Sequence, residues 1–496
     1  MHIIQLPLCT RQCDVRALNK RFYEMNHIHN VLVKHGIEQL KALKSDPEYA
    51  KLLQAYKNAT KTKKKHISNQ LSAVRLQYGL SEAQLQAYAK LCGKQFRKRL
   101  SSQQVQKEAT RVWQGIQKCI FSDGKRLHFK KYNELTTIQG KTNTNGVKFD
   151  KDALAIDWQG LHLLCRSPKL SKDIHYIKES LNHKVKYCEI VRKMFNNGWH
   201  YYVNVYLDGD APLKQMTIKD GTMGIDPGVS AIAAVSNDKI FLRELAPDCK
   251  KYNKKIVRLQ QQIDRSKRQS NPKKYNPDGT IIKNNRNKWI YSKTCKKKMR
   301  QLTALYRQKA AYIKQSHRLL CDELIQSASV IYIEEMNFKA LQKRAKKTER
   351  SDKLSSIKQK DGSVKQIHKY KRKKRFGKSL NNRAPASFLQ ILEYKASRYN
   401  VSVAYINTKT YKASQYNHKT GACTPVTLGQ RTKEIGRTKV QRDLYSAFLI
   451  QHPKKNLMTP KRTACTKDFK HFVKMQNALI TEMKENGISM KQCFGF

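Results

Sequence analysis

The chain has 496 residues, 39% of them hydrophobic, so it is long enough to bury two or three cores. Lys and Arg number 100 against 37 Asp and Glu, which gives a formal net charge of +63. Self-repulsion on that scale destabilises a compact fold unless a polyanion neutralises it, so we expect nucleic acid as the partner. No apolar run reaches the roughly 18 residues of a spanning helix, which argues against a membrane protein.

The cysteines and the N-terminal segment indicate the compartment. Twelve cysteines are spread along the chain, and no two of them form a C-x-x-C pair. This pattern is typical of reduced thiols. The first residues, MHIIQLPLCTRQCDVRALNKRF, lack a basic region followed by a long apolar core, so we expect no secretion signal. Both observations favour a cytoplasmic protein.

The N-terminal part of the chain changes from helical to strand-like patterns. Residues 16–124 have apolar positions at spacings of three and four, as in FYEMNHIHNVLVKHGIEQLKAL, which predicts a domain of amphipathic, basic helices. Residues 125–215 have a period of two, as in GWHYYVNVYLDG, which predicts a small β-barrel or a sandwich. The segment HIIQLPL could add one more strand to this barrel. Residues 1–15 and 125–215 would then form one domain, and the helical domain would be an insertion in it.

From residue 216 to 450, strands and helices alternate. Three antiparallel strands are expected in MGIDPGVSAIAAVS and KIFLREL, followed by long basic helices at about 250–268 and 288–327. VIYIEEM predicts a strand buried on both faces. The basic insert 338–380 has few apolar residues, so we expect it to be mobile without nucleic acid. A helix in PASFLQILEYKASRY, a strand in VSVAYIN and a helix near RDLYSAFLIQ follow, and residues 451–496 form a basic extension.

This order of elements is that of an RNase H-like α/β fold, so the whole chain is expected to be a multidomain α+β protein. In that fold an acid in the first strand, one at the end of the fourth strand and one on the last helix converge. Those places hold Asp226, Glu334 and Asp443. Carboxylates that converge can hold two Mg²⁺ ions roughly 4 Å apart, which activate the water and stabilise the leaving oxygen in phosphodiester hydrolysis.

Each acid also has an ordinary structural explanation. Asp226 precedes Pro-Gly and could begin a turn, and Glu334 could be an ordinary solvated carboxylate at a strand end. Asp443 could stabilise the first turn of a helix by its interaction with the helix dipole. An acid inside an apolar strand is unfavourable unless it is paired or bound to a metal. One acid at each of three expected places therefore favours a metal site.

Three segments carry a resemblance to a known family. MGIDPGVSAIAAVS, VIYIEEMNFKAL and VQRDLYSAFLI resemble the three RuvC motifs of transposon-encoded TnpB nucleases and of related compact type V CRISPR effectors, and the match covers roughly residues 185–450. The resemblance implies an RNA-guided DNA endonuclease, a hydrolase in which Asp226, Glu334 and Asp443 are the catalytic ligands of Mg²⁺. Two ions are expected, and Mn²⁺ could substitute. We prefer Glu334 to Glu335 because it directly follows VIYI.

The resemblance also implies partners and a layout. The partners would be a guide RNA with a structured scaffold and a double-stranded target DNA with a short flanking motif, gripped by one chain per RNA rather than by a dimer. The helical domain would grip the heteroduplex, the barrel would be the wedge domain that holds the scaffold, and residues 216–450 would be the RuvC-like nuclease domain. The cell would be bacterial or archaeal, with the protein at the nucleoid when it is bound to DNA.

The chain departs from the family between residues 408 and 440. The family usually has a zinc ribbon with two C-x-x-C pairs there, whereas this chain offers only His418 and Cys423. Two ligands cannot close a tetrahedral structural zinc site. We therefore expect a degenerate ribbon without zinc, in which packing or RNA holds the loop.

Basic and aromatic residues outside the acid positions are candidates for nucleic-acid contacts. Cations of the insert would bind phosphates, and aromatic residues of NGWHYYVNVY would stack on RNA bases. The alternatives are a solvated charge run and ordinary core aromatics. The candidates are Lys343, Arg344, Lys346, Lys347, Lys371, Arg372, Lys373, Lys374, Arg375, Trp199 and Tyr201.

Three other functions are compatible with the sequence. An RNA-guided DNA-binding protein with decayed cleavage would be expected to have lost one of the acids. A DNA transposase would use the same fold and metal chemistry but would ordinarily bind no RNA. A structural basic protein that packs the nucleoid has no reason to place three acids at these positions.

Overall fold

The chain divides into two compact units, Met1–Leu213 and Lys214–Phe496, and both combine helices with β-sheets. The computed structural model describes residues 1–122, 124–195, 197–277, 279–282, 285, 287–342, 350–358, 363–370, 376–427, 429–489 and 494–496. The chain is therefore a mixed α+β protein with more than one domain, as its alternating patterns predicted.

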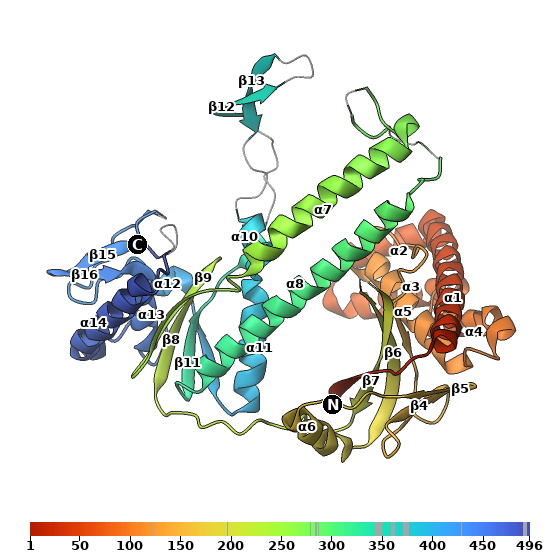
Figure 1. The fold of residues 1–496 in the computed structure, drawn as a ribbon, viewed down its shortest axis with the longest axis horizontal. Coiled ribbons are helices and arrows are strands. Elements are labelled where there is room, and N and C mark those ends of the chain that lie inside the picture. Colours follow the sequence, from red (N-terminus) through yellow and green to blue (C-terminus); the bar gives the residue numbers. More distant parts are fainter. Residues whose placement is uncertain are drawn as a thin grey trace. The chain divides into compact units, whose positions relative to one another are not determined.

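Five α-helices follow the first strand of unit 1 (Figure 1). In α1, Leu18, Phe22 and Met25 recur at spacings of three and four and are almost fully buried, which is why this segment is helical and amphipathic. Ser101 begins α5 with a capping box, since its hydroxyl accepts from the Gln104 N–H at 3.3 Å. The helices are α1 (Gln12–Ser45), α2 (Pro47–Asn58), α3 (Lys61–Gln77), α4 (Glu82–Cys92) and α5 (Ser102–Phe121).

The strands of unit 1 form two sheets. One has the order β1-β7-β6-β2 and the other β3-β4-β5, and α6 (Ser171–Leu181) lies between β5 and β6 in the sequence. The strands are β1 (His2–Pro7), β2 (Thr137–Gln139), β3 (Val147–Asp150), β4 (Ala155–Trp158), β5 (Leu161–Leu164), β6 (Val185–Phe195) and β7 (Gly198–Leu207).

Strand β1 pairs antiparallel with β7, which confirms that the N-terminal segment joins a sheet formed some 200 residues later. The prediction of a β-barrel is wrong for the described residues, because their strands in unit 1 form two separate sheets. The sheets are joined at one side by a bridge between Leu8 and Cys165. The strands β3, β4 and β5 are only four residues long, too few to continue the ladder of the longer β6 and β7.

The helices and sheets of unit 1 share one hydrophobic core, which includes Phe22 from α1 and Trp158 from β4. The Arg21 guanidinium lies over the Trp158 ring at 5.1 Å and donates to the Trp158 and Gln159 carbonyls. A buried cation thus joins the helical layer to the smaller sheet.

The central sheet of unit 2 has five strands in the order β10-β9-β8-β11-β14 (Figure 1). The first three are antiparallel hairpin neighbours, whereas β11 runs parallel to both β8 and β14. The strands are β8 (Thr222–Pro227), β9 (Ala231–Ser236), β10 (Ile240–Glu244), β11 (Val330–Glu334) and β14 (Ser402–Ile406). The three antiparallel strands and the two later strands that the sequence predicted are confirmed.

Helices cover both faces of this sheet. Ile225 and Ile333 pack on one face against α8 (Lys293–Ile325) and α11 (Pro385–Arg398). The other face packs against α13 (Arg442–Gln451) and α14 (Arg462–Glu485), with Val235 and Phe448 in that core. The C-terminal extension, which the sequence left without a place, thus supplies α14 as a covering helix.

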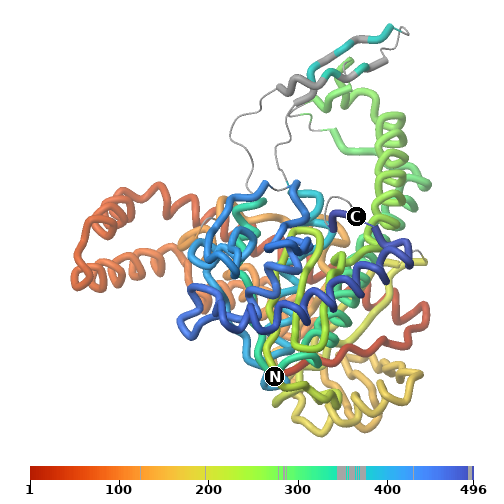
Figure 2. Tube along the Cα trace, turned by 90° about the vertical axis from the view of Figure 1, so that its left-hand side faces the viewer, coloured from red at the N-terminus to blue at the C-terminus, as the bar shows by residue number. Residues whose placement is uncertain are grey.

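Two further features lie outside this layered core. Helix α7 (Cys249–Ser270) packs along α8, and the tube in Figure 2 shows this green helical pair extending away from the sheet. In the basic insert, β12 (Arg350–Lys358) and β13 (Val364–Tyr370) pair as an antiparallel hairpin between α9 (Phe338–Leu341) and α10 (Gly377–Arg383). The sequence did not predict this hairpin, because its alternation is masked by dense charge.

The region 408–440 contains the short helix α12 (Thr408–Tyr411) and the hairpin of β15 (Thr432–Ile435) and β16 (Thr438–Gln441), which leads directly into α13. Among the helices of the described residues, none combines the length and the apolar character required to cross a membrane.

Candidate active site

Asp226 and Glu334 lie side by side on neighbouring parallel strands. The register pairs Ile225 with Ile333, so the next residue on each strand is an acid. Side chains alternate along a strand. Because Ile225 and Ile333 both pack in the core with α8 and α11, the two carboxylates point to the opposite face, toward α13.

Helix α13 brings Asp443 to the same place because it packs directly on β8 at Gly224. A Cβ atom built on Gly224 would lie 2.1 Å from the Ala447 carbonyl oxygen and 2.2 Å from the Gln451 nitrogen, so only glycine allows this approach. The Gln451 amide also donates to the Thr222 carbonyl at 3.2 Å. The C-terminal end of α13 is thus tied to the start of β8, and its first turn, with Asp443, lies toward Asp226.

The pKa values of Asp226 and Glu334 are both raised by burial and by neighbouring carboxylates. Burial raises the pKa of Asp226 well above its usual value, and the neighbouring Glu334 and Asp443 carboxylates raise it further. Burial also raises the pKa of Glu334 to about 7, and Asp443 adds to this rise. Glu334 is 8% exposed, whereas the adjacent Glu335 is exposed to solvent.

The Asp226 carboxylate has no hydrogen-bond or ion-pair partner among the described residues, although the chain has a large excess of cations. It retains partial exposure on the α13 side of the sheet. An unpartnered acid inside an apolar strand is a position that a cation would stabilise.

Asp443, in contrast, is held by two arginines. The Arg431 Nη1 atom lies 3.2 Å from Asp443 Oδ2, and the Arg442 Nη2 atom lies 2.8 Å from Asp443 Oδ1. The Gln441 side chain caps α13 by accepting from the Leu444 N–H at 2.7 Å. Among the described residues, no three His, Cys, Asp or Glu side chains stand in an arrangement that could hold a metal ion.

Sequence reasoning missed both arginines. Arg442 is adjacent to Asp443, and Arg431 lies in the segment LGQRTKEIG, where one more cation carries no signal. The Arg442 guanidinium also donates to the Gln430 carbonyl at 2.8 Å, so it links the loop before β15 to the helix start. Only the fold shows that this loop faces the acids.

His418 and Cys423, the two possible zinc ligands that the sequence offers between residues 408 and 440, lie in different environments. His418 is buried among aromatic rings, and its Nδ1 atom lies 2.8 Å from the Tyr445 hydroxyl. Burial lowers the pKa of His418 to about 4. Cys423 is exposed. Arg462 of α14 donates to the His418 carbonyl at 2.8 Å, so contacts within the protein hold this loop. The absence of zinc stays a prediction.

The aromatic candidates of β7 differ in burial, because Tyr201 is buried and Trp199 is half-buried. Tyr201 is 2% exposed, and its hydroxyl donates to Asn19 Oδ1 at 2.6 Å. The Arg192 guanidinium lies over the Trp199 ring at 4.4 Å. The prediction that Tyr201 stacks on RNA bases is therefore wrong, because its ring is buried. Stacking by Trp199 stays a prediction, and a base there would have to share the ring with Arg192.

The cationic candidates lie outside the described residues. They are Lys343, Arg344, Lys346, Lys347, Lys371, Arg372, Lys373, Lys374 and Arg375.

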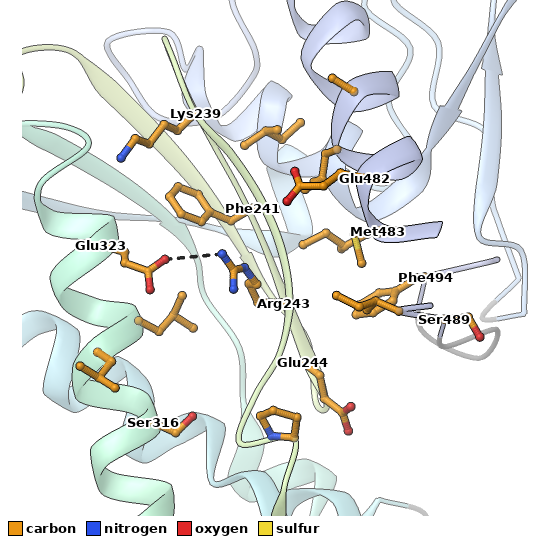
Figure 3. A pocket seen from close by; sticks show the side chains of 18 of the residues that line it. Lys239, Phe241, Arg243, Glu244, Ser316, Glu323, Glu482, Met483, Ser489 and Phe494 are labelled. Carbon is orange, nitrogen blue, oxygen red and sulfur yellow. Dashed lines mark ion pairs between the residues drawn. The ribbon is translucent and has the colours of Figure 1, made fainter. Parts of the chain in front are cut away.

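A pocket of about 1000 Å³ opens elsewhere in unit 2, beside the edge strand β10 and between side chains of α8 and α14 (Figure 3). In it Arg243 and Glu323 form an ion pair at 3.6 Å. None of the three candidate acids lines this pocket. Its charged lining residues are Asp238, Glu244, Glu323 and Glu482 against Lys239 and Arg243, so it does not favour a polyanion.

Comparisons with known proteins give structural likeness at low identity. No protein-family model matches the chain, and no curated protein sequence matches it. The chain is similar to one in the cryo-EM structure of a Cas12f1–sgRNA–target DNA complex, with 13% identity, a TM-score of 0.41 and coverage of 87% of this chain and 82% of that one. It is also similar to a chain in a CRISPR–Cas12f ternary complex, with 14% identity, a TM-score of 0.29 and coverage of 92% and 99%.

Proposed function

We propose that this protein is an RNA-guided DNA endonuclease that hydrolyses phosphodiester bonds at a single RuvC-like site. The observation that carries the proposal is the placement of Asp226 beside Glu334 on adjacent parallel strands, with Asp443 on the helix that crosses them. The strand order 3-2-1-4-5 and the closing helix are those of an RNase H-like domain. RNA guidance rests on the RuvC motif resemblance, and the net charge of +63 suits two nucleic-acid partners.

The donor chemistry of the site fits Mg²⁺, which prefers oxygen ligands. Asp226, Glu334 and Asp443 would hold it, and the bound metal would activate water and stabilise the leaving oxygen. The raised pKa values of Asp226 and Glu334 show that ionised carboxylates are unfavourable in this buried site, where they lie close together. A divalent cation would offset that cost, so these residues are poised to exchange protons for metal.

Arg431 has a distinct part in this proposal. Its guanidinium holds Asp443 in the first turn of α13 and would have to yield one carboxylate oxygen to the metal. Released from Asp443, Arg431 would remain beside the site, where a cation stabilises the phosphate of the scissile strand. Target loading and metal binding would then be coupled through one side chain.

The arginine pairs also favour a second candidate function. With Asp443 occupied by Arg431 and Arg442, the protein could be an RNA-guided DNA-binding protein whose cleavage has decayed. The retention of all three acids is the opposing observation.

Guided cleavage can be tested on the intact protein. The gene is expressed with its native flanking DNA, and the RNA that copurifies with the protein is sequenced. A discrete RNA with a constant structured part and a variable end supports guidance, and cleavage of DNA matching that end in Mg²⁺ but not in EDTA supports the nuclease. Binding without cleavage supports the second candidate. Absence of a discrete RNA contradicts both RNA-guided functions and favours a DNA transposase that uses the same acids.

A further inference from the structure

The edge strand β10 lies between two helices that cover opposite faces of the five-stranded sheet. Figure 3 shows Glu323 of α8 on one side of β10 and Glu482 and Met483 of α14 on the other. All five residues of β10 line the pocket of about 1000 Å³, which we call the slot. Both helices therefore extend past the last strand and leave a space beside it.

The outer side of β10 carries backbone groups without a strand partner. Among the described residues β10 pairs only with β9, and the two strands run antiparallel. Just past β10, the Leu245 N–H donates to the Ser230 carbonyl at 3.0 Å. Since hydrogen-bonded and non-bonded pairs alternate in such a ladder, the N–H and C=O groups of Ile240, Leu242 and Glu244 point away from β9. A row of such groups is a template for a further strand.

The slot has the dimensions of one added strand. In a sheet, one residue takes up about 4.8 Å across the strands, about 10 Å through the layer and about 3.4 Å along the strand. A volume of about 1000 Å³ thus holds about six residues, which is a typical strand length and close to the length of β10. An extended occupant fits this space better than a helix, whose diameter is about 10 Å.

Mainly apolar side chains line the two walls of the slot. The lining residues of each helix recur at spacings of three and four, so each wall is one stripe of its helix. Side chains of an added strand point alternately to the two faces of the sheet, and each would meet one of these walls. The wall residues are Tyr312, Ser316 and Leu319 of α8 and Met475, Leu479 and Met483 of α14.

The slot is acidic, although the chain has a large excess of cations. Four of its six charged lining residues are acids. Glu482 is exposed and has no ion-pair partner among the described residues. Glu323, on the opposite wall, makes only the 3.6 Å contact with Arg243, and both side chains are about half exposed. Because the Debye length is about 8 Å at physiological ionic strength, these acids repel nucleic acid from the slot and attract a cationic peptide.

From these observations we propose that the slot binds an extended, cationic segment of a partner protein, which adds to the sheet as a sixth strand beside β10. Main-chain hydrogen bonds to β10 provide affinity, the apolar walls accept alternate side chains, and Glu323 and Glu482 pair with Lys or Arg. This binding site is independent of the proposed nuclease, because none of the three candidate acids lines the slot.

The test measures binding of a fluorescein-labelled peptide of eight alternating Lys and Val residues to the full-length protein by fluorescence anisotropy. A peptide of alternating Lys and Pro has the same charge but cannot join a sheet. The charge variant is Glu323→Gln/Glu482→Gln. Its control is Glu434→Gln/Glu485→Gln, because both of these acids are exposed and neither lines the slot. Peptide held by copurified nucleic acid contributes equally to both variants, since their net charges are the same.

We expect the Lys-Val peptide to bind the native protein and the control equally and the charge variant about tenfold more weakly. Leu319→Ser, which changes a wall residue that is 55% exposed, should also weaken binding. Val257→Ser should not, because this half-exposed residue lies on α7. Hydrogen exchange of residues 240–244, followed by mass spectrometry, should slow with the Lys-Val peptide and not with the Lys-Pro peptide.

Four results would overturn the proposal. Failure of the Lys-Val peptide to bind would show that the slot accepts no strand. Equal binding of the two peptides would show attraction by charge alone. Equal affinities of the charge variant and its control would place the peptide elsewhere on the protein. Dimerisation of the native protein without peptide, measured by sedimentation and lost in the charge variant, would assign the slot to a second copy of this chain.

Discussion

Arg431 Nη1 lies 3.2 Å from Asp443 Oδ2, so a guanidinium occupies one oxygen of the third candidate metal ligand. Both side chains are about one fifth exposed, and a divalent ion could therefore compete for the oxygen. This contact connects the segment 408–440, from which Arg431 comes, to the first turn of α13.

Arg431→Ala should increase the affinity for Mn²⁺, used as a probe of the Mg²⁺ site, because it removes the competing cation. We expect a gain of about tenfold in the absence of nucleic acid, since a charge-assisted hydrogen bond contributes on the order of 1 to 2 kcal/mol. Electron paramagnetic resonance of free Mn²⁺ gives the measurement. Arg437→Ala is the control, because Arg437 is an exposed arginine of the same region. Equal Mn²⁺ affinities in both variants would rule out competition by Arg431.

Gly224→Ala should displace α13 from the sheet, because the added methyl group would lie 2.1 Å from a backbone oxygen that cannot move alone. We expect a destabilisation of at least about 1 to 3 kcal/mol, together with loss of cleavage. Thermal unfolding measures the first effect. Gly429→Ala is the matched control, since nothing lies within 4 Å of its built Cβ atom. A Gly224→Ala protein as stable as this control would contradict the close approach.

The pH dependence of stability should separate Glu334 from Glu335. The folded-state pKa of Glu334 is raised to about 7 from an ordinary value of 4.5. The native state therefore holds a proton that the unfolded chain has lost, and stability falls as the pH rises from about 4.5 to 7. The loss should be on the order of 1 to 3 kcal/mol, and Mg²⁺ should restore it at pH 8.

Glu334→Gln should flatten this pH profile and abolish the Mg²⁺ effect, whereas Glu335→Gln should change neither, because Glu335 is exposed. Denaturant unfolding at several pH values, with Mg²⁺ or EDTA, provides the data. If Glu335→Gln flattened the profile instead, the ligand assignment would move by one residue.

Glu108 is expected to dominate the acid sensitivity of unit 1. Its burial would raise its pKa, but the His29 hydrogen bond and the charges of Lys130 and Arg111 lower the pKa to about 2. The stability it contributes is present above about pH 4.5 and is lost as the pH falls toward 2. Glu108→Gln should destabilise the protein by about 3 to 5 kcal/mol at pH 7, because it leaves buried cations without their anion.

Glu38→Gln is the control for Glu108, since Glu38 is an exposed acid paired with Lys34 at 3.9 Å on the neighbouring helix α1. It should cost less than about 1 kcal/mol. Comparable unfolding midpoints for the two variants would show that the Glu108 network contributes little.

The sequence predicted most elements of unit 2, because its apolar runs have clear periods and its turns contain Pro-Gly and Asn-Asp. It also predicted that acids far apart in the chain would face one another. It could not predict that Asp443 is held by Arg431, since one arginine among 100 cations carries no signal. The sequence also did not predict that the strands of unit 1 form two sheets instead of a barrel. Period two indicates strands, but it does not say whether short strands such as β3 and β5 complete a barrel.

Asp226→Ala tests most directly whether the acids on β8, β11 and α13 form a DNA-cleaving site. The native protein and the variant, each with its copurified RNA, are compared for binding and cleavage of a matching DNA duplex in Mg²⁺. We predict that the variant binds RNA and DNA with native affinity and that its cleavage rate falls by at least about 10³-fold, because the lost carboxylate serves the metal and not the grip. Cleavage by Asp226→Ala at the native rate would contradict the assignment.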